Sequence, residues 1–247
     1  PWESASEEDK LAYRRARTEI EDKNAALAQK NYRTTECLFV ANKYKDEEAF
    51  WHGWSFDFRG RVYPIATSLS PQGTDFDKAL LIFAEPGPVN EWWLSFQVAT
   101  TYGLDKAPLR ERIQWAEDNK EFISLVASDP TGTINEWSCV EEPWCFLAAA
   151  IEFYECVILK TKTTSGLPVS VDATCSGLQH LSALALDKTA AEMVNVVPTE
   201  KPSDGYAIVA AKAKEILPQK LHKEITRHTC KRTVMTTPYG VTEHYAR

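Results

Sequence analysis

An apolar stretch from Trp144 to Leu159, with three alanines at its centre, limits the possible folds of this chain more than any other feature. A stretch of this kind predicts a helix buried in a protein core. It is shorter than the roughly 20 residues that a helix needs to cross a bilayer, and no other apolar run in the 247 residues approaches that length. We therefore expect a globular chain with one large domain or two smaller ones.

Capping and turn residues divide the rest of the chain into further elements. Ser6-Glu-Glu-Asp9 forms a capping-box pattern that opens a charged helix to about Gln29. Strands are expected on either side of a turn at Gly60, within Phe50–Ile65. A turn is expected at residues 70–73, a short strand over 167–171, and helices over 35–44, 76–84, 90–127 in two or three pieces, 178–186, 204–217 and 218–237. These elements predict an α+β fold that is mostly helical.

The charge of the chain is uneven. The net charge is −7, which argues against a general nucleic-acid-binding protein. Residues 210–247, however, hold five Lys and three Arg against three Glu, so this segment carries +5 and the remainder −12. A local basic segment on an acidic chain suits a site that grips phosphate, although a solvated helix face is the more common explanation of such charge alone.

The six cysteines are scattered and include no Cys-x-x-Cys pair, which argues against a structural zinc site and favours reduced thiols. The N-terminus has no basic start, no apolar signal region and no initiator methionine. These features fit a piece of a longer protein, and we expect no targeting segment within this piece.

The C-terminal segment contains a helical pattern of residues that could bind a ligand. Arg227, Lys231, Met235 and Tyr239 are four residues apart and so share one helix face, and Gly240 follows directly. The two cations could meet the phosphates of a nucleoside triphosphate, and the two larger side chains its sugar and base. Considered alone, an amphipathic surface helix explains this spacing more often.

Two further places could carry chemistry. Asp172 follows the expected strand and precedes a Ser/Gly turn, where a carboxylate can point into a cleft and bind Mg²⁺. Arg59 and Arg61 flank Gly60 and could approach a phosphate chain. In isolation, a helix-capping aspartate and an exposed charged hairpin are the more common explanations.

Taken together and in order, these segments resemble the single-subunit RNA polymerases of phages and mitochondria. The resemblance rests on Asp57-Phe-Arg-Gly-Arg-Val-Tyr63 with Pro71-Gln-Gly73, Val171-Asp-Ala-Thr-Cys-Ser-Gly-Leu-Gln-His180 and Arg227-x-x-x-Lys231-Arg-Thr-Val-Met-Thr-x-x-Tyr239-Gly240, with Glu142–Leu147 and Asp204-Gly-Tyr206 as further landmarks. It runs from about residue 50 to the end of the chain and more weakly before it. A match of several motifs in a set order is far more specific than any one of them.

The resemblance implies a role for each matching residue. Asp172 would bind the first Mg²⁺, together with the backbone carbonyl of Ala173, and Lys231 would be catalytic by protonating or neutralising the departing pyrophosphate. The implied nucleotide-binding residues are Arg227, Lys231, Met235, Tyr239, Gly240, Tyr206 and Gly177. Arg59 and Arg61, with Lys78 as a weaker companion, would lie along the template and the nascent hybrid.

The implied reaction is DNA-directed RNA synthesis, in which an RNA 3′-hydroxyl attacks the α-phosphate of a ribonucleoside triphosphate between two Mg²⁺. The implied fold is part of a right-hand polymerase, with the end of the thumb in residues 1–48, the palm in 49–200 and the start of the fingers in 201–247. The family's second metal-binding aspartate and its promoter-binding domain lie outside the chain, so we expect this piece to be inactive by itself.

Two alternatives remain open. A-family DNA polymerases share the Arg/Lys/Tyr spacing, but they have Phe-Gly where this chain has Met235-Thr236 and a glutamate where it has Gly177. A missing side chain at Gly177 leaves room for a ribose 2′-hydroxyl, which favours RNA synthesis. The other alternative is a non-catalytic nucleic-acid-binding remnant, against which the matching residues argue.

The chain departs from the family pattern at two positions. Ala173 replaces a usual glycine, which is harmless unless its φ must be positive. Pro238 should end or kink the helix just before Tyr239. The expected partners are a DNA template, nascent RNA and ribonucleoside triphosphates, with no membrane and a monomeric full-length protein. Its location would be the host cytoplasm if viral, and a mitochondrion or another organelle if eukaryotic.

Overall fold

The computed structural model describes residues 6–58, 60–199 and 201–246. The chain divides into two compact units. The first comprises residues up to 103 together with 119–168, and the second comprises 104–118 together with 169–247. Helices predominate in both, and among the described residues the strands form two small two-stranded sheets in the first unit. The expectation of a mostly helical chain is therefore confirmed.

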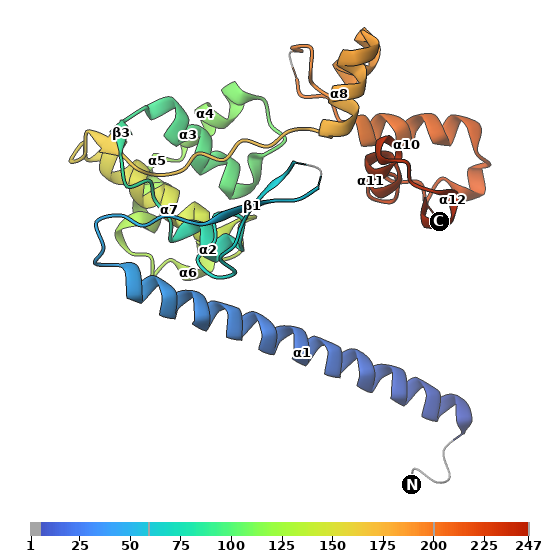
Figure 1. Ribbon diagram of the computed structural model, residues 1–247, viewed down its shortest axis with the longest axis horizontal. Coiled ribbons are helices and arrows are strands. Elements are labelled where there is room, and N and C mark those ends of the chain that lie inside the picture. Colours follow the sequence, from blue (N-terminus) through green and yellow to red (C-terminus); the bar gives the residue numbers. More distant parts are fainter. Residues whose placement is uncertain (1–5, 59, 200, 247) are drawn as a thin grey trace. The chain divides into compact units, whose positions relative to one another are not determined.

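The first unit is built around a helical core (Figure 1). Its helices are α1 (Glu7–Tyr44), α2 (Asp75–Ala79), α3 (Glu91–Ala99), α5 (Lys120–Ser128), α6 (Ile134–Trp137) and α7 (Pro143–Phe153), with π-helical turns at Thr100–Leu104 and Tyr154–Ile158. Its strands are β1 (Trp54–Phe56), β2 (Val62–Pro64), β3 (Gly87–Pro88) and β4 (Thr164–Ser165). The helices expected between residues 90 and 127 are thus present in several pieces, with a break near Gly103, whereas α2 is shorter than expected.

Helix α7 is the centre of this core, as the apolar stretch predicted. It packs against α2, α3 and α5. Phe146 and Phe153 on α7 are completely buried, and the ring centroid of Phe146 lies 5.6 Å from that of Tyr102 and 6.2 Å from that of Phe122. Burial of each large apolar side chain stabilises the folded state by about 1.5–3 kcal/mol, so this cluster holds the unit together.

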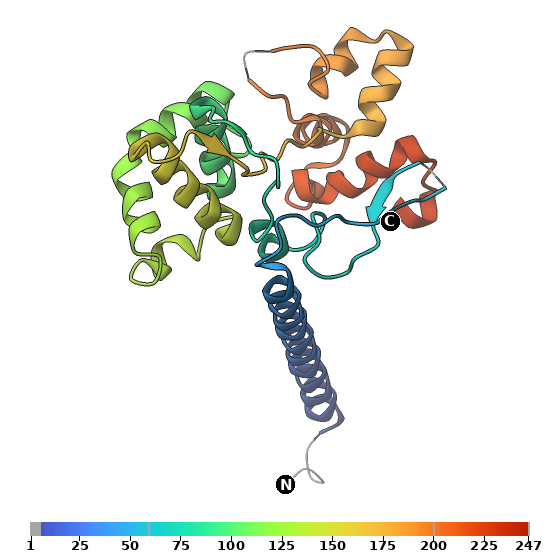
Figure 2. The ribbon, with the colours of Figure 1, turned by 60° about the vertical axis from the view of Figure 1, so that its left-hand side comes forward.

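Helix α1 begins where the capping box predicted, because the Ser6 side chain accepts a hydrogen bond from the amide of Asp9. It then continues without a break to Tyr44, as Figures 1 and 2 show. The prediction of a second, separate helix from Thr35 was wrong. Thr34 and Thr35 donate their hydroxyls to carbonyls one turn earlier, at 3.1 and 3.0 Å, so they stay within the helix instead of capping a new one. None of the described helices is both long and apolar enough to span a membrane.

The expected hairpin around Gly60 is present. Strands β1 and β2 are antiparallel, with Ser55 opposite Tyr63, and Gly60 has a φ of +76° in the turn between them. A glycine suits this turn because other residues rarely adopt a positive φ. The turn at residues 70–73 is also confirmed by the bond from the Gly73 amide to the Ser70 carbonyl, at 2.9 Å.

The strand expected over residues 167–171 is absent from the described structure. The pairing segment lies just before it, where Thr164–Ser165 forms β4 against Gly87–Pro88. A strand exists only where a neighbouring strand completes its hydrogen bonds, and none of the described strands pairs with residues 167–171. The segment leading to Asp172 is therefore irregular.

The second unit contains α4 and the helices from α8 onward. They are α4 (Leu109–Asp118), α8 (Ser176–Ala185), α9 (Lys188–Met193), α10 (Gly205–Ile216), α11 (Arg227–Thr236) and α12 (Glu243–Ala246), with 3₁₀ turns at Gln219–Leu221 and Thr237–Tyr239. Within this unit α8 packs on α9, and α10 packs on α11. Helix α8 also contacts the 3₁₀ turn that follows α11.

The single helix predicted from Pro218 to about residue 237 is in fact two elements. A short 3₁₀ turn follows Pro218, and α11 starts separately at Arg227. Thr226 begins α11 with a capping box, in which its side chain accepts from the Thr229 amide at 3.2 Å and the Thr229 hydroxyl accepts from the Thr226 amide at 2.9 Å. Arg227 consequently lies in the first turn of a helix, at its N-terminus.

Candidate functional site

The segment around Asp172 is exposed and irregular. One carboxylate oxygen of Asp172, Oδ1, accepts a hydrogen bond from the amide of Ala173 at 2.9 Å. Carboxylate and carbonyl oxygens are the ligands that Mg²⁺ prefers, and Mg²⁺ commonly uses only one or two of them from the protein. Asp172 and the carbonyl of Ala173 therefore suit this ion chemically.

Alanine at position 173 causes no backbone conflict in this structure. The left-handed residue of this segment is Cys175, with a φ of +52°, and Ala173 does not have a positive φ. Cys175 directly precedes α8 as its N-cap residue. The departure from the family's glycine at position 173 is accordingly harmless for φ.

Gly177 in the first turn of α8 lies directly against Tyr239. A Cβ atom at position 177 would be 3.1 Å from both Cζ and Oη of Tyr239, and 3.2 Å from Cβ of Pro238. These distances are shorter than ordinary carbon contacts, which begin near 3.5 Å. The absence of a side chain at Gly177 lets the Tyr239 ring approach the start of α8.

Tyr206, in the first turn of α10, also contacts the segment that follows Asp172. It is only 8% exposed. Burial raises the pKa of the Tyr206 hydroxyl to about 12, and its hydrogen bond with the Cys175 thiol adds to the effect. Thr174 makes a further link, because the side-chain amide of Asn195 donates to its hydroxyl at 3.3 Å and to the carbonyl of Ser203, just before α10, at 2.9 Å.

Arg227 is held at the same end of α10. Its Nε donates to the carboxylate of Asp204, and its guanidinium carbon lies 5.5 Å from the centroid of the Tyr206 ring. Asp204 is at once the N-cap of α10, because its Oδ1 accepts from the amides of Tyr206 and Ala207 at 3.1 and 3.2 Å. The sequence suggested Asp204 as a helix start and as part of a family landmark, but its pairing with Arg227 was missed.

The remaining residues of the predicted cationic face lie along α11 and just beyond it. Lys231 is exposed and makes no ion pair among the described residues, and Met235 is 40% exposed. The helix ends at Thr236, and Pro238 lies in the 3₁₀ turn that follows, as predicted. Gly240 then reverses the chain with a φ of +75°.

The second unit therefore contains most of the candidate residues, and it joins several of them through contacts. Gly177 touches Tyr239, Tyr206 bonds to Cys175, and Arg227 lies over Tyr206. Arg61 and Lys78 belong to the other unit, and Arg59 lies outside the described residues.

Arg61 lies in the β1–β2 turn and is held there by its backbone. Its amide donates to Oδ1 of Asp57 at 3.0 Å, and its carbonyl accepts from the Asp57 amide at 2.9 Å. Asp57 thus closes the turn and leaves Arg61 exposed at the tip of the hairpin. A role of Arg61 on a nucleic acid remains a prediction.

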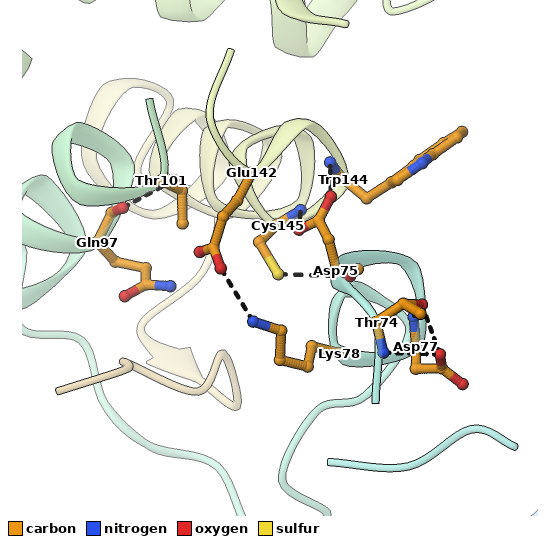
Figure 3. A network of polar contacts seen from close by, with 9 residues as sticks. All are labelled: Thr74, Asp75, Asp77, Lys78, Gln97, Thr101, Glu142, Trp144 and Cys145. Carbon is orange, nitrogen blue, oxygen red and sulfur yellow. Dashed lines mark hydrogen bonds and ion pairs between the residues drawn. The ribbon is translucent and has the colours of Figure 1, made fainter. Parts of the chain in front are cut away.

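Lys78 belongs to a polar network inside the first unit, shown in Figure 3. Its ammonium pairs with Glu142 at 3.0 Å, and this pair outweighs the effect of burial, so the pKa of Lys78 lies above its ordinary value. The Asp75 carboxylate accepts from the amides of Trp144 and Cys145 at 2.7 and 3.0 Å. Asp75 thereby caps α7, whose own N-cap residue Glu142 provides no side-chain cap.

Asp75, Glu142 and Cys145 are close enough to one another to be considered as metal ligands. The Lys78 ammonium, however, already neutralises the Glu142 carboxylate. Burial and the nearby Asp75 also raise the pKa of the Cys145 thiol well above its ordinary value, which opposes the thiolate that a metal requires. This cluster is better explained as the structural link between α2 and α7.

Comparison with known proteins identifies the family. Residues 85–247 match the DNA-dependent RNA polymerases. The chain belongs to this family. This bears out the resemblance to the single-subunit RNA polymerases of phages and mitochondria.

Three relatives illustrate the match. The chain is 37% identical to the mitochondrial DNA-directed RNA polymerase of Neurospora crassa over 100% of its length and 19% of that protein. It is 35% identical to T7 RNA polymerase of Escherichia phage T7 over 83% of its length and 23% of the relative. It is also 35% identical to the mitochondrial DNA-directed RNA polymerase 1 of Arabidopsis thaliana, over 85% of this chain and 24% of the relative. The chain therefore spans about a fifth to a quarter of the length of these three relatives.

Proposed function

We propose that the protein containing this chain is a DNA-directed RNA polymerase that adds ribonucleotides from nucleoside triphosphates to an RNA 3′-end. The observation that carries the proposal is the contact of Gly177 with Tyr239. It joins α8, which starts four residues after Asp172, to the turn that follows the helix bearing Arg227 and Lys231. These are the segments on which the family resemblance rests.

In this proposal Arg227 and Lys231 bind the triphosphate. Arg227 lies in the first turn of α11, and Lys231 follows one turn later on an exposed face. Charged donors make strong, short hydrogen bonds to phosphate, and helix N-termini favour anions. Lys231 is in addition the candidate proton donor to the departing pyrophosphate.

The sugar and base of the nucleotide would lie against Tyr239, Met235 and Gly240, with Tyr206 and Gly177 on the sugar side. Met235 and Tyr239 are both partly exposed at the C-terminal end of α11, where a flat base could pack on them. Gly177 has no side chain to oppose a ribose 2′-hydroxyl, and this favours RNA over DNA building blocks.

Asp172 and the carbonyl of Ala173 would hold Mg²⁺. The exposed carboxylate and the ordinary φ of Ala173 support this assignment. At such a site Mg²⁺ would stabilise charge on the attacking and leaving oxygens of the phosphoryl transfer. The second carboxylate of a two-metal site would come from outside the chain, so we expect the chain alone to be inactive in primer extension.

Arg59, Arg61 and Lys78 are the proposed contacts to the template and the nascent hybrid. Of the two described residues, Arg61 is exposed in the β1–β2 turn, and Lys78 pairs with Glu142. In the right-hand arrangement that we propose, residues 1–48 end the thumb, 49–200 belong to the palm and 201–247 begin the fingers. We further propose that the full-length enzyme is a monomer. Action in a phage-infected host or in an organelle fits the origins of the named relatives.

The proposal is tested in the full-length polymerase by Asp172→Ala. We expect loss of RNA extension from a primed template. Binding of the DNA template should be largely retained, because the carboxylate is proposed to bind the catalytic Mg²⁺ and not the template. The matched control is Asp187→Ala, at the N-cap of α9 in the same unit. Extension by Asp172→Ala at the rate of the unchanged enzyme would refute the role of Asp172.

A further inference from the structure

We propose that Asp204 is a positioning residue that orients Arg227 for the triphosphate. This inference rests on the proposed function, in which Arg227 binds the triphosphate. It adds a residue that was not among the candidates from the sequence. Asp204 would act through Arg227 and would not itself touch the nucleotide.

The Asp204 carboxylate divides its two oxygens between two tasks. Oδ1 caps α10 by accepting from the amides of Tyr206 and Ala207, at 3.1 and 3.2 Å. Oδ2 accepts from Nε of Arg227. One rigid side chain thereby ties the first turn of α10 to the first residue of α11, and these two helices pack together.

The guanidinium of Arg227 is held on two sides. Asp204 accepts a hydrogen bond from its Nε, and its central carbon lies over the Tyr206 ring, 5.5 Å from the ring centroid. Tyr206 is itself almost fully buried, so the ring provides a firm support. Stacking of a guanidinium on an aromatic face adds to the attraction.

This arrangement leaves the useful edge of Arg227 open. A guanidinium has five N–H donors, of which the Nε–H serves Asp204. Within the described part of the chain, the four donors on the two Nη atoms have no other partner. Those four donors form the planar fork that binds phosphate oxygens in pairs, so the bond to Asp204 orients the side chain without occupying the fork.

Lys231 shows the difference that Asp204 makes. It has no ion pair among the described residues and its side chain is exposed. A long side chain of this kind must be ordered when the ligand binds. Arg227 has lost that freedom already in the folded protein. Holding a functional group in its binding geometry in advance is a general way to raise affinity.

The Asp204 carboxylate also has an effect that opposes phosphate binding by Arg227. The bonds from Arg227 and from the helix amides outweigh the effect of burial and keep the pKa of Asp204 below its ordinary value, so the carboxylate is charged at neutral pH. A negative charge beside Arg227 weakens its attraction for phosphate. Loss of the Asp204 charge should weaken triphosphate binding through lost orientation of Arg227 and strengthen it through lost repulsion. We infer that the effect on orientation is larger.

The test is Asp204→Asn in the full-length polymerase. Asparagine caps helices about as well as aspartate, so α10 keeps its start while Arg227 loses its anionic partner. We expect KM and the dissociation constant of a ribonucleoside triphosphate to rise roughly tenfold, the effect of one charged hydrogen bond. We expect kcat to change much less. An unchanged or lower KM would overturn the proposal.

The matched control is Asp187→Asn. Asp187 caps α9 through the amide of Ala190 at 3.1 Å and pairs with no arginine in the described chain. It therefore reports the effect of the same substitution at a helix cap without a cation. If Asp187→Asn raised KM as much as Asp204→Asn, the effect would come from capping and the proposal would fail.

A double-mutant cycle with Arg227→Ala separates this inference from the proposed function. We expect Arg227→Ala to raise KM strongly, and Asp204→Asn to add little once Arg227 is gone. If Arg227→Ala left KM unchanged, both the triphosphate role of Arg227 and the positioning role would be refuted. If Arg227→Ala raised KM and the effect of Asp204→Asn were additive, only the positioning role would be refuted. Should Asp204→Asn fail to fold, Asp204→Ser, which also caps helices, takes its place in the cycle.

Discussion

The Tyr239 side chain occupies the space that a side chain at Gly177 would need. Both Cζ and Oη of Tyr239 lie 3.1 Å from the position of a Cβ at residue 177. The sequence suggested that Gly177 leaves room for a ribose hydroxyl. The structure adds that Gly177 lies against the tyrosine proposed to contact the sugar, so we expect a side chain here to affect the nucleotide through Tyr239 as well.

Substitution Gly177→Ala should therefore alter sugar selection more than stability. Alanine is better than glycine in a helix by about 1 kcal/mol, which offsets the strain of the close contact, but the Tyr239 ring has to move. We expect the ratio of kcat/KM for ribonucleoside and deoxyribonucleoside triphosphates to change by about tenfold, as a shift of about 1.4 kcal/mol implies. The measurement is single-nucleotide incorporation with each substrate, beside thermal unfolding of both proteins.

Tyr239→Phe is the companion variant, because it removes the hydroxyl oxygen, one of the two Tyr239 atoms that lie 3.1 Å from the position of the alanine methyl. In the Tyr239→Phe background we expect the added methyl at position 177 to have a smaller effect. Equal effects of Gly177→Ala in both backgrounds would mean that Gly177 acts without Tyr239.

Loss of the Lys231 ammonium should slow the reaction. We expect Lys231→Ala to lower the single-turnover rate by roughly 10²–10³, the usual effect of removing one donor that acts in the transition state. The matched control is Arg232→Ala, the next cation along the same helix, which is also exposed and lies on another face. A similar loss in both variants would point to the general charge of α11 instead of a specific role.

The buried hydroxyl of Tyr206 should make stability fall at high pH. Its pKa is raised from about 10 to about 12 in the folded protein, by burial and by Cys175. Between these values the unfolded chain releases this proton and the folded chain keeps it, so the free energy of unfolding decreases as pH rises. Tyr206→Phe should flatten this part of the dependence, measured by denaturant unfolding from pH 9 to 12. Parallel curves for the two proteins would contradict the shifted pKa.

The Asp75 cap should matter for stability and not for metal binding. Asp75→Ala removes the acceptor of the Trp144 and Cys145 amides, and we expect it to lower the free energy of unfolding by about 1–2 kcal/mol. The control is Asp46→Ala, at an exposed position after α1. Added Zn²⁺ should leave the stability unchanged, and a Zn²⁺-dependent rise that disappears in Cys145→Ser would show that the cluster binds metal.

Local patterns predicted much of the fold because their causes are local. The Ser6 capping box, the Gly60 hairpin, the buried α7 and the end of α11 before Pro238 all depend on residues within a few positions of one another. The predictions failed where pairing or competition decided the outcome. Residues 167–171 have strand-forming side chains but no neighbouring strand in the described structure, and Thr34 and Thr35 bond within α1 instead of starting a new helix.

By itself the sequence determined the family, because several short motifs in a set order are specific even when each one is common. The same motifs named the candidate residues and their spacing along α11. Only the tertiary structure decided which of them meet. The contacts of Gly177 with Tyr239 and of Asp204 with Arg227 join residues 62 and 23 positions apart, and such pairs depend on how helices pack, which no local pattern encodes.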